Sequence, residues 1–321
     1  MIVEGLVSVI IPVHNRPVLI REAIESALKQ TYRPIEIIVV DDGSNDDTPE
    51  VLEKLASKNS EIRVLHRLNG GPGMARETGR KEARGEFIQY LDSDDLLLPG
   101  KFGLQVGGLR KAPECGISYG KTLHSGIGQE PELEPLKRTG EKFQTLFPAL
   151  LLSRWWSSST PLYRRSVTDL VGPWQPLSNE EDWEYEARAG ALGVKLHFCS
   201  EFVSVTRWHD GNRLHHNGTS DPIKLAHRAR AHELILQHAR AAGITNDSPE
   251  MQNFARQLFH LCRQCAAAGL ELEARLLFSL SREASDVSRQ KELDFIMYDL
   301  ATRCLGWKGA ARIASLVERV R

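Results

Sequence analysis

The stretch that decides the fold reads Phe87-Ile88-Gln89-Tyr90-Leu91-Asp92-Ser93-Asp94-Asp95, an apolar run that ends in three carboxylates within four residues. Carboxylates this close repel one another, so a folded protein needs a cation or a bound proton to offset the charge. Oxygen ligands at the end of a strand suit Mg²⁺ or Mn²⁺ carrying a phosphate. The alternative is a solvated turn in which Asp94 or Asp95 only caps the following helix.

The chain before this run alternates between short apolar stretches and amphipathic ones. Pro12 is expected to stop the first stretch, because proline has no N–H to donate to a ladder. Alternating strands and helices imply right-handed crossovers and a mostly parallel, Rossmann-like α/β sheet with flanking helices. The expected strands are 7–11, 35–40, 62–65 and 87–91, and the expected helices begin at Pro17, Thr48 and Gly73.

Polar clusters follow three of these strands, at 12–15, 41–44 and 92–95. In a parallel sheet, ligands bind beyond the carboxyl ends of the strands, so the three clusters are expected to share one edge. The chain has neither GxGxxG after the first strand nor a GxxxxGK[ST] loop. The sheet is therefore expected to bind a nucleotide by another arrangement.

Composition narrows the class of protein. The 321 residues are 41% hydrophobic and 26% charged, which is typical of a globular protein of about two domains, and the net charge of −1 argues against nucleic acid as a partner. Five scattered cysteines fit a reducing cytoplasm, and the one CxxC pair, Cys262 and Cys265, falls in a helical segment without the second pair of a zinc site. No secretion signal and no long apolar segment are expected.

The chain carries an ordered set of motifs, which are Ser8–Arg16, Val39–Ser44 with Asp47–Thr48, Gly73–Arg76, Ala83–Phe87, and Leu91–Asp95 with Pro99. This set resembles the bacterial-type family 2 glycosyltransferases of the GT-A fold, most clearly over residues 7–103 and more thinly to about residue 210. The resemblance implies transfer of a sugar, with inversion, from a nucleotide-diphosphate-sugar donor to the hydroxyl of a sugar, glycolipid or other acceptor. It also implies a role in cell-surface polysaccharide or glycolipid synthesis.

The resemblance assigns roles at the nucleotide. Asp42 is expected to hydrogen-bond the base of the donor, and Pro12 and His14 line the same pocket. Arg76 is expected to face the nucleotide. The plainer alternatives are that Asp42 only forms a turn and that Arg76 is an arginine on a helix surface.

Asp92 and Asp94 match the DxD motif of the family. The resemblance makes Asp94 the ligand of a divalent cation, Mn²⁺ or Mg²⁺, that bridges the pyrophosphate, with Asp92 contacting the donor and Asp95 supporting from behind. After the expected strand 202–206, Arg207 is predicted to contact the diphosphate and His209 to complete the metal site. Both could instead be structural residues.

Two later motifs complete the predicted site. Trp156 lies among small hydroxyl residues and could stack on a sugar, although a buried core tryptophan is the commoner case. The acidic segment 179–184 resembles the family motif whose aspartate is the general base, which makes Asp182 the base. Glu181 is a possible substitute, and a simple helix N-terminal charge is the alternative for Asp182.

The remaining chain is organised more loosely. Residues 126–140 are expected to form a loop or irregular hairpin, and from Pro222 the periodicity is wholly helical. We predict a catalytic domain over 1–215 and a helical domain over 216–321, located in the cytoplasm or peripherally at the inner face of the membrane. The helical domain could form a homodimer, touch a membrane-bound acceptor or hold a partner enzyme, and the residues do not choose among these.

Two other functions fit a phosphate-handling sheet. A sugar-phosphate nucleotidyltransferase would carry a glycine-rich basic segment after the first strand, where this chain has Pro12–Arg16. A non-catalytic domain that binds nucleotide-sugar or glycan would not need the intact acidic motifs.

Overall fold

A computed structural model of the chain describes residues 2–208, 221–288 and 293–320. Its contacts divide these residues into two compact units. The first runs to Leu146 and also takes in Arg154–Pro176 and the chain from Leu192 to Trp208. The second contains Phe147–Ser153, Leu177–Ala191 and the helices from Pro222 onward. The boundary near residue 215 remains a prediction about separately folding domains.

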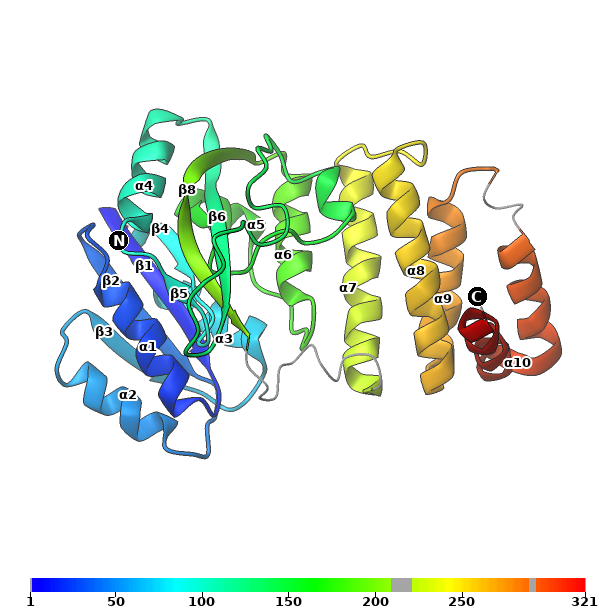
Figure 1. Cartoon of the computed structure of the whole chain (residues 1–321), viewed down its shortest axis with the longest axis horizontal. Helices are drawn as coiled ribbons and strands as arrows, with labels where there is room; N and C mark the ends of the chain where they lie inside the picture. Colours follow the sequence, from blue (N-terminus) through cyan, green and yellow to red (C-terminus); the bar gives the residue numbers. More distant parts are fainter. Residues whose placement is uncertain (1, 209–220, 289–292, 321) are drawn as a thin grey trace. The chain divides into compact units, whose positions relative to one another are not determined.

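The first unit is built on one mixed sheet of eight described strands with helices on both faces (Figure 1). Across the sheet the strands are β3 (Ile62–His66), β2 (Ile35–Asp41), β1 (Val3–Val13), β4 (Gly85–Tyr90), β7 (Leu162–Arg164), β6 (Cys115–Gly126), β8 (Lys195–Trp208) and β5 (Leu96–Leu97). Neighbouring strands among the first four in this order are parallel, and β7 is antiparallel to both of its neighbours. Strands β6 and β8 are parallel, and β5 is antiparallel to β8.

Alternation along β1 explains how the helices cover the sheet. Val9 and Ile11 belong to the core cluster that includes the inner faces of α1, α2 and α4. Ile10 points to the other face, where a Cβ added to Gly79 of α3 would lie 2.4 Å from the Ile10 Cγ2 atom. Glycine at this position therefore lets α3 lie directly on the sheet. The helices of this unit are α1 (Pro17–Leu28), α2 (Thr48–Ala56), α3 (Pro72–Glu82), α4 (Lys101–Lys111) and α5 (Arg165–Val171).

The expectation that Pro12 stops the first strand is wrong. Pro12 is buried inside β1, which continues to Val13. The Ile10 carbonyl accepts from Leu91 on the β4 side, and the Val13 carbonyl accepts from Asp42 on the β2 side. Pro12 therefore directs its ring nitrogen toward β4, whose pairing with β1 has already ended at Ile10. No ladder hydrogen bond is lost, so the proline is tolerated.

The segment after residue 104 contains a strand that the sequence did not predict. β6 pairs with β8 along most of its length, with shifts of register near Gly120. The irregular segment expected at 126–140 is confirmed, since beyond β6 only an isolated bridge joins His124 to Glu132.

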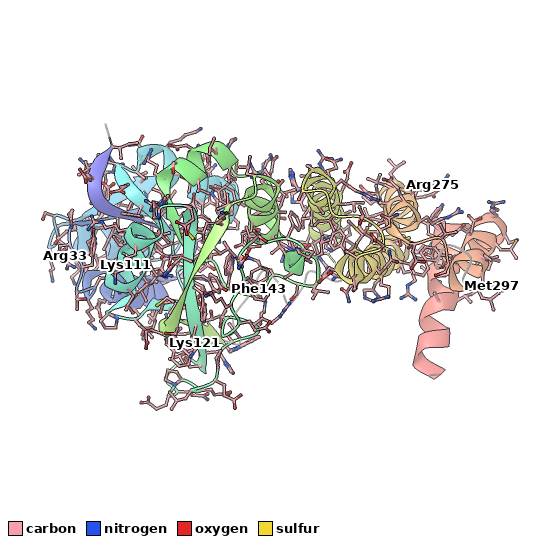
Figure 2. All side chains as sticks on the ribbon, turned by 90° about the horizontal axis from the view of Figure 1, so that it is seen from above. Arg33, Lys111, Lys121, Phe143, Arg275 and Met297 are labelled. Atoms are coloured by element: carbon pink, nitrogen blue, oxygen red, sulfur yellow. The ribbon has the colours of Figure 1, made fainter. Side chains whose placement is uncertain are left out.

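The second unit is helical in all its described elements. Gly269 ends α8 in the left-handed conformation, with φ 84°, which is the helix, glycine, helix pattern expected from the sequence. Cys262 and Cys265 are buried in α8, and burial raises the pKa of both thiols to about 12. Met297 lies on an exposed part of α10 (Figure 2). The elements are η1 (Ala149–Leu151), α6 (Glu181–Ala191), α7 (Pro222–Ala241), α8 (Pro249–Ala268), α9 (Glu271–Ala284) and α10 (Leu293–Val320).

None of the helices in the described part of the chain has both the length and the hydropathy that crossing a bilayer requires.

Candidate active site

The polar ends of β2, β1 and β4 lie on one edge of the sheet, because the three strands are adjacent and parallel. Two contacts join them directly. The Nδ1 atom of His14 lies 3.1 Å from the backbone oxygen of Asp42. Arg16 Nη1 lies 2.8 Å from Asp94 Oδ2. Residues that the sequence placed at three separate strand ends are thus brought into contact along one edge, which is called the polar edge below.

Asp42 organises the loop that follows β3. Its carboxylate accepts hydrogen bonds from the backbone N–H groups of Gly70, at 3.1 Å, and Gly71, at 2.7 Å, and it pairs with the guanidinium of Arg67. The Asp42 side chain is 5% exposed and that of Arg67 is 21% exposed. The loop therefore fixes the orientation of the Asp42 carboxylate. Its predicted role, a hydrogen bond to the nucleobase of the donor, stays a prediction.

Each carboxylate of the DxD motif pairs with an arginine. Asp94 pairs with Arg16, and Asp92 Oδ1 lies 2.7 Å from Arg76 Nη2. The Arg76 side chain is only 4% exposed, and its guanidinium carbon lies 4.9 Å from the ring centroid of Trp174. The alternative of a solvated helix-surface arginine is therefore wrong for Arg76, which is a buried partner of the acidic motif.

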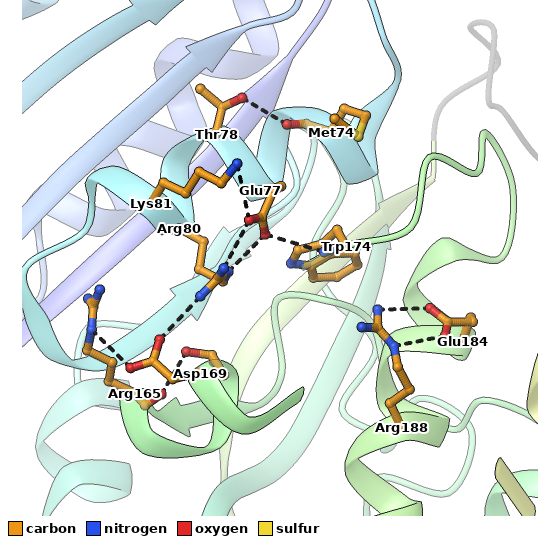
Figure 3. Close-up of polar contacts among 11 residues, drawn as sticks. Met74, Glu77, Thr78, Arg80, Lys81, Arg165, Asp169, Trp174, Glu184 and Arg188 are labelled. Carbon is orange, nitrogen blue, oxygen red and sulfur yellow. Dashed lines mark hydrogen bonds and ion pairs between the residues drawn. The ribbon is translucent and has the colours of Figure 1, made fainter. Parts of the chain in front are cut away.

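The helix that carries Arg76 is fixed to α5 by a second ionic network (Figure 3). Glu77 accepts from Arg80 Nε at 2.8 Å and from the backbone N–H of Trp174 at 3.3 Å. Arg80 also reaches Asp169 of α5 at 3.2 Å. The Glu77 carboxylate is 4% exposed, so this network holds both α3 and the ring beneath Arg76.

Asp95 lies behind the motif and is 3% exposed. Burial, followed by the charges of Asp94 and Asp92, raises the pKa of Asp95 to about 8. Its carboxyl group accepts from Ser159 Oγ at 2.8 Å and from the Arg207 backbone N–H at 3.2 Å. Asp95 thus links the acidic segment to two others that are distant in the sequence.

Arg207, predicted to contact the diphosphate, reaches the acidic segment. Its side chain donates to the backbone oxygen of Asp94 and pairs with Glu22 of α1. It is 5% exposed at the residue level, so it is held against the motif at the end of β8. His209, the second metal ligand expected from the sequence, lies outside the described residues.

Trp156 lies in an aromatic cluster inside the first unit. It is 1% exposed, and its ring centroid lies 5.1 Å from those of Tyr119 and Trp155. Phe143 extends the cluster, with its centroid 4.5 Å from that of Trp155. A ring buried in this way favours the packing role that the sequence left open over stacking on a sugar.

Replacement of Trp156 by alanine is expected to lower the free energy of unfolding by ~4 kcal/mol, because it leaves a large cavity in the core. Denaturant titration followed by circular dichroism measures this change. Trp208, which is 50% exposed, is the matched control, and Trp208→Ala should cost no more than about 1 kcal/mol. A Trp156→Ala protein as stable as the Trp208→Ala protein would contradict the packing role.

Asp182 lies in the first turn of α6, in the second unit. It is half-buried, and its Oδ1 atom accepts from the N–H of Trp183 at 2.8 Å. Glu181 and Glu184 share this first turn, where the helix dipole stabilises negative charge. Asp182 thus lies at the start of a helix, as the sequence predicted, and its catalytic role remains a prediction.

The residue before α6 is held by ion pairs within the second unit. Glu180 adopts a left-handed φ of 60°, which a non-glycine residue seldom adopts. Its carboxylate lies 2.9 Å from Arg228 Nε and 2.9 Å from His232 Nδ1. Burial raises the pKa of Glu180, but the nearby His232 and Arg228 outweigh it, so the net shift is downward and the group stays ionised.

The same helix is braced one turn later. Glu184 is 1% exposed and lies 2.8 Å from Arg188 Nε (Figure 3). His238 of α7 reaches Glu184 at 3.3 Å. The turn that carries Asp182 is therefore anchored by ionic contacts on both sides in the sequence.

Three residues of the polar edge were missed by sequence reasoning. Arg16 and Arg67 pair with Asp94 and Asp42, and Trp174 underlies Arg76. Arg16 was detectable in principle, because it directly follows the first polar cluster, 12–15. Arg67 comes from the loop after β3, and Trp174 comes from a segment about 100 residues beyond Arg76 in the sequence. No spacing of residue types marks either of them.

The residues at this edge fit a divalent cation by their chemistry. Asp92 and Asp94 offer hard carboxylate oxygens, which are the ligands that Mg²⁺ and Mn²⁺ prefer. No group of three His, Cys, Asp or Glu side chains arranged for a metal occurs among the described residues. The two DxD carboxylates are instead neutralised by arginines in this structure.

The fold and the polar edge define an α/β domain with charged side chains gathered at the ends of its strands. Residues 8–163 match the model of the family "Glycosyl transferase family 2", so this part of the chain is a glycosyl transferase family 2 domain.

Two relatives agree with this assignment. An uncharacterized glycosyltransferase of Rickettsia felis is 39% identical over 145 residues, which are 45% of this chain and 23% of the relative. A putative glycosyltransferase of Bacillus subtilis, EpsH, is 33% identical over 216 residues, which are 63% of this chain and 58% of the relative. The chain therefore spans less than two thirds of the length of each.

Solved structures share the fold. TarS 1–349 of S. aureus, in complex with UDP-GlcNAc, superposes with a TM-score of 0.70 at 20% identity, over 98% of this chain and 92% of that one. The mannosyltransferase PcManGT of Pyrobaculum calidifontis, in complex with GDP-Man and Mn²⁺, gives a TM-score of 0.53 at 19% identity, over 98% and 86%. The predicted fold, a GT-A α/β sheet followed by helices, is confirmed.

Proposed function

We propose that this chain is an inverting glycosyltransferase that moves a sugar from a nucleotide-diphosphate-sugar to an acceptor hydroxyl. One observation carries the proposal. The ends of β1, β2 and β4 bring His14, Asp42 and the Asp92–Asp94 motif onto one edge of a family 2 domain. The edge offers polar groups for a base together with carboxylates and arginines for a diphosphate and its cation.

In this proposal the nucleotide binds at His14 and Asp42, and the diphosphate lies toward the acidic motif. Arg76 and Arg207 are fixed cations beside that motif and supply positive charge toward the phosphates. Asp94 would hold Mn²⁺ or Mg²⁺ and Asp92 would contact the donor, and a cation at Asp94 would stabilise the negative charge that gathers on the departing diphosphate. The Mn²⁺ in the PcManGT complex supports this cofactor.

The chemical step needs a base for the acceptor. Asp182 accepts the proton of the acceptor hydroxyl, the oxygen forms a bond to the anomeric carbon, and the bond from that carbon to the phosphate oxygen breaks. The nucleoside diphosphate leaves with the electron pair, and the configuration inverts.

A panel of nucleotide-sugars, each with and without Mn²⁺, tests the proposal on the purified chain. Binding at ~100-fold excess over the dissociation constant should stabilise the fold by ~2.7 kcal/mol, seen as a rise in melting temperature. At least one donor should stabilise only with Mn²⁺ and should release nucleoside diphosphate slowly. UDP-GlcNAc and GDP-Man are the first donors to try, since TarS and PcManGT were solved with them.

The rival functions are separated by this panel together with a second assay, in which the chain is given nucleoside triphosphates and sugar phosphates. Release of pyrophosphate from a nucleoside triphosphate and a sugar phosphate would identify a nucleotidyltransferase. Donor binding without any turnover, even by water, would identify a non-catalytic binding domain.

The proposal also includes a biological role and a location. The role is in cell-surface polysaccharide or glycolipid synthesis, and the location is the cytoplasm, with contact to the membrane surface.

A further inference from the structure

Arg16 occupies the carboxylate that the proposed function gives to the cation. It lies between the end of β1 and the start of α1, and its Nη1 atom is 2.8 Å from Asp94 Oδ2 and 3.3 Å from Ser93 Oγ. The side chains of Arg16 and Asp94 are 21% and 13% exposed. The guanidinium and a metal ion therefore compete for one partly buried carboxylate.

Arg16 differs in its anchoring from the other arginine of the motif. The Arg76 side chain is 4% exposed, with its guanidinium carbon 4.9 Å from the Trp174 ring centroid and Nη2 3.5 Å from Ser158 Oγ. A displacement of Arg76 would have to open this packed site. Arg76 is thus a fixed cation beside Asp92.

Separate contacts hold the guanidinium of Arg16 and its backbone. Within the described residues its guanidinium has two hydrogen-bond partners, Asp94 and Ser93. Its backbone is separately fixed, because its N–H donates to Thr48 Oγ1 at 2.9 Å and its carbonyl accepts from Ile20 at 3.1 Å. Rotation of the side chain can therefore move the guanidinium without disturbing the start of α1.

We infer that Arg16 is an exchangeable counter-ion, which neutralises Asp94 before the donor binds and moves to the donor's diphosphate when the cation takes its place. This inference rests on the proposed function and adds a coupling to it. Two cations on one carboxylate repel each other, whereas a diphosphate brings enough negative charge for both. The cation alone must displace Arg16 without a new partner for it, so Mn²⁺ and diphosphate each strengthen the binding of the other.

The test uses the full chain and two titrations, Mn²⁺ alone and then UDP or GDP at saturating Mn²⁺. Arg16→Gln should bind Mn²⁺ alone ~5-fold more tightly, because a competing cation is gone, and should bind the diphosphate ~10-fold more weakly, because a phosphate contact is gone. These changes have opposite signs. A residue that only supports the fold would weaken both affinities or neither.

Arg63→Gln is the matched control, because Arg63 also pairs with a carboxylate, Glu82, at 3.0 Å in the same unit. It should change neither affinity. Arg16→Lys keeps the charge and should keep Mn²⁺ affinity near that of the unaltered chain, which holds the test open if the glutamine variant folds poorly.

The outcomes separate the two proposals. If the unaltered chain binds none of the nucleoside diphosphates of the donor panel with Mn²⁺, the proposed function fails and the exchange fails with it. If the unaltered chain binds one of them, but Arg16→Gln moves both affinities in the same direction or leaves both unchanged, only the role of Arg16 is overturned.

Discussion

Asp94→Asn is expected to lower kcat/KM for the donor found in the panel by roughly 1,000-fold, the scale seen when a group that stabilises developing negative charge is removed. The amide keeps the shape of the side chain but has no charge and binds a divalent cation weakly. The leaving diphosphate then loses the counter-charge held beside it. Nucleoside diphosphate release, measured over a range of Mn²⁺ concentrations, gives the effect.

The fold should survive this change. The Arg16–Asp94 pair is partly exposed, so its loss should cost no more than about 1 kcal/mol of stability, and melting followed by circular dichroism checks this. Glu50→Gln is the matched control, because Glu50 is an exposed carboxylate in the first turn of α2. Its turnover should be unchanged. If the Asp94→Asn enzyme keeps its full Mn²⁺-stimulated turnover, Asp94 is not the residue that holds the cation.

The first half of the sheet was predictable because its signals are local. β1, β2, β3 and β4 are apolar runs separated by amphipathic helices, and each β-α unit fixes the place of the next. The alternation of strands and helices alone predicts that the carboxyl ends of these strands meet at one edge of the sheet. The convergence of His14, Asp42 and Asp94 on one edge was therefore a prediction that needed no tertiary information.

The second half of the sheet was not predictable in this way. β6 buries Ser118 and Thr122 completely, so its inner face does not have an apolar pattern. Thr122 Oγ1 is satisfied instead by Thr160 Oγ1 at 2.7 Å and by Ser204 Oγ at 3.1 Å, hydroxyls from two other segments. Periodicity cannot find a strand whose buried polar groups depend on partners elsewhere in the chain.

The same limit applies within the site. Spacing marks the carboxylates, since Asp92 and Asp94 stand at the end of an apolar run. Their arginine partners are chosen by tertiary contact, and an arginine with a buried partner looks like any surface arginine in the sequence. Trp156 shows the converse, because small hydroxyl neighbours suggested a sugar site where the structure has a packed core.

The Asp182→Asn substitution is expected to have the second large effect, a fall in kcat of ~1,000-fold, because a positioned general base contributes about 100- to 10,000-fold to the rate. The asparagine amide cannot accept the proton of the acceptor hydroxyl. Binding of the nucleoside diphosphate with Mn²⁺ should be unchanged, because the base acts on the acceptor. Single-turnover transfer and a nucleotide titration measure the two quantities separately.

Two variants test the alternatives for this position. Glu181→Gln removes the neighbouring carboxylate of the same turn, and loss of turnover there, with an active Asp182→Asn enzyme, would transfer the role to Glu181. Glu271→Gln removes a first-turn carboxylate from α9 and should cost only about 0.5 kcal/mol of stability, as expected for a charge at a helix N-terminus. If Asp182→Asn behaves like Glu271→Gln, with a small loss of stability and full turnover, Asp182 is a helix-terminal charge and another group must take the proton.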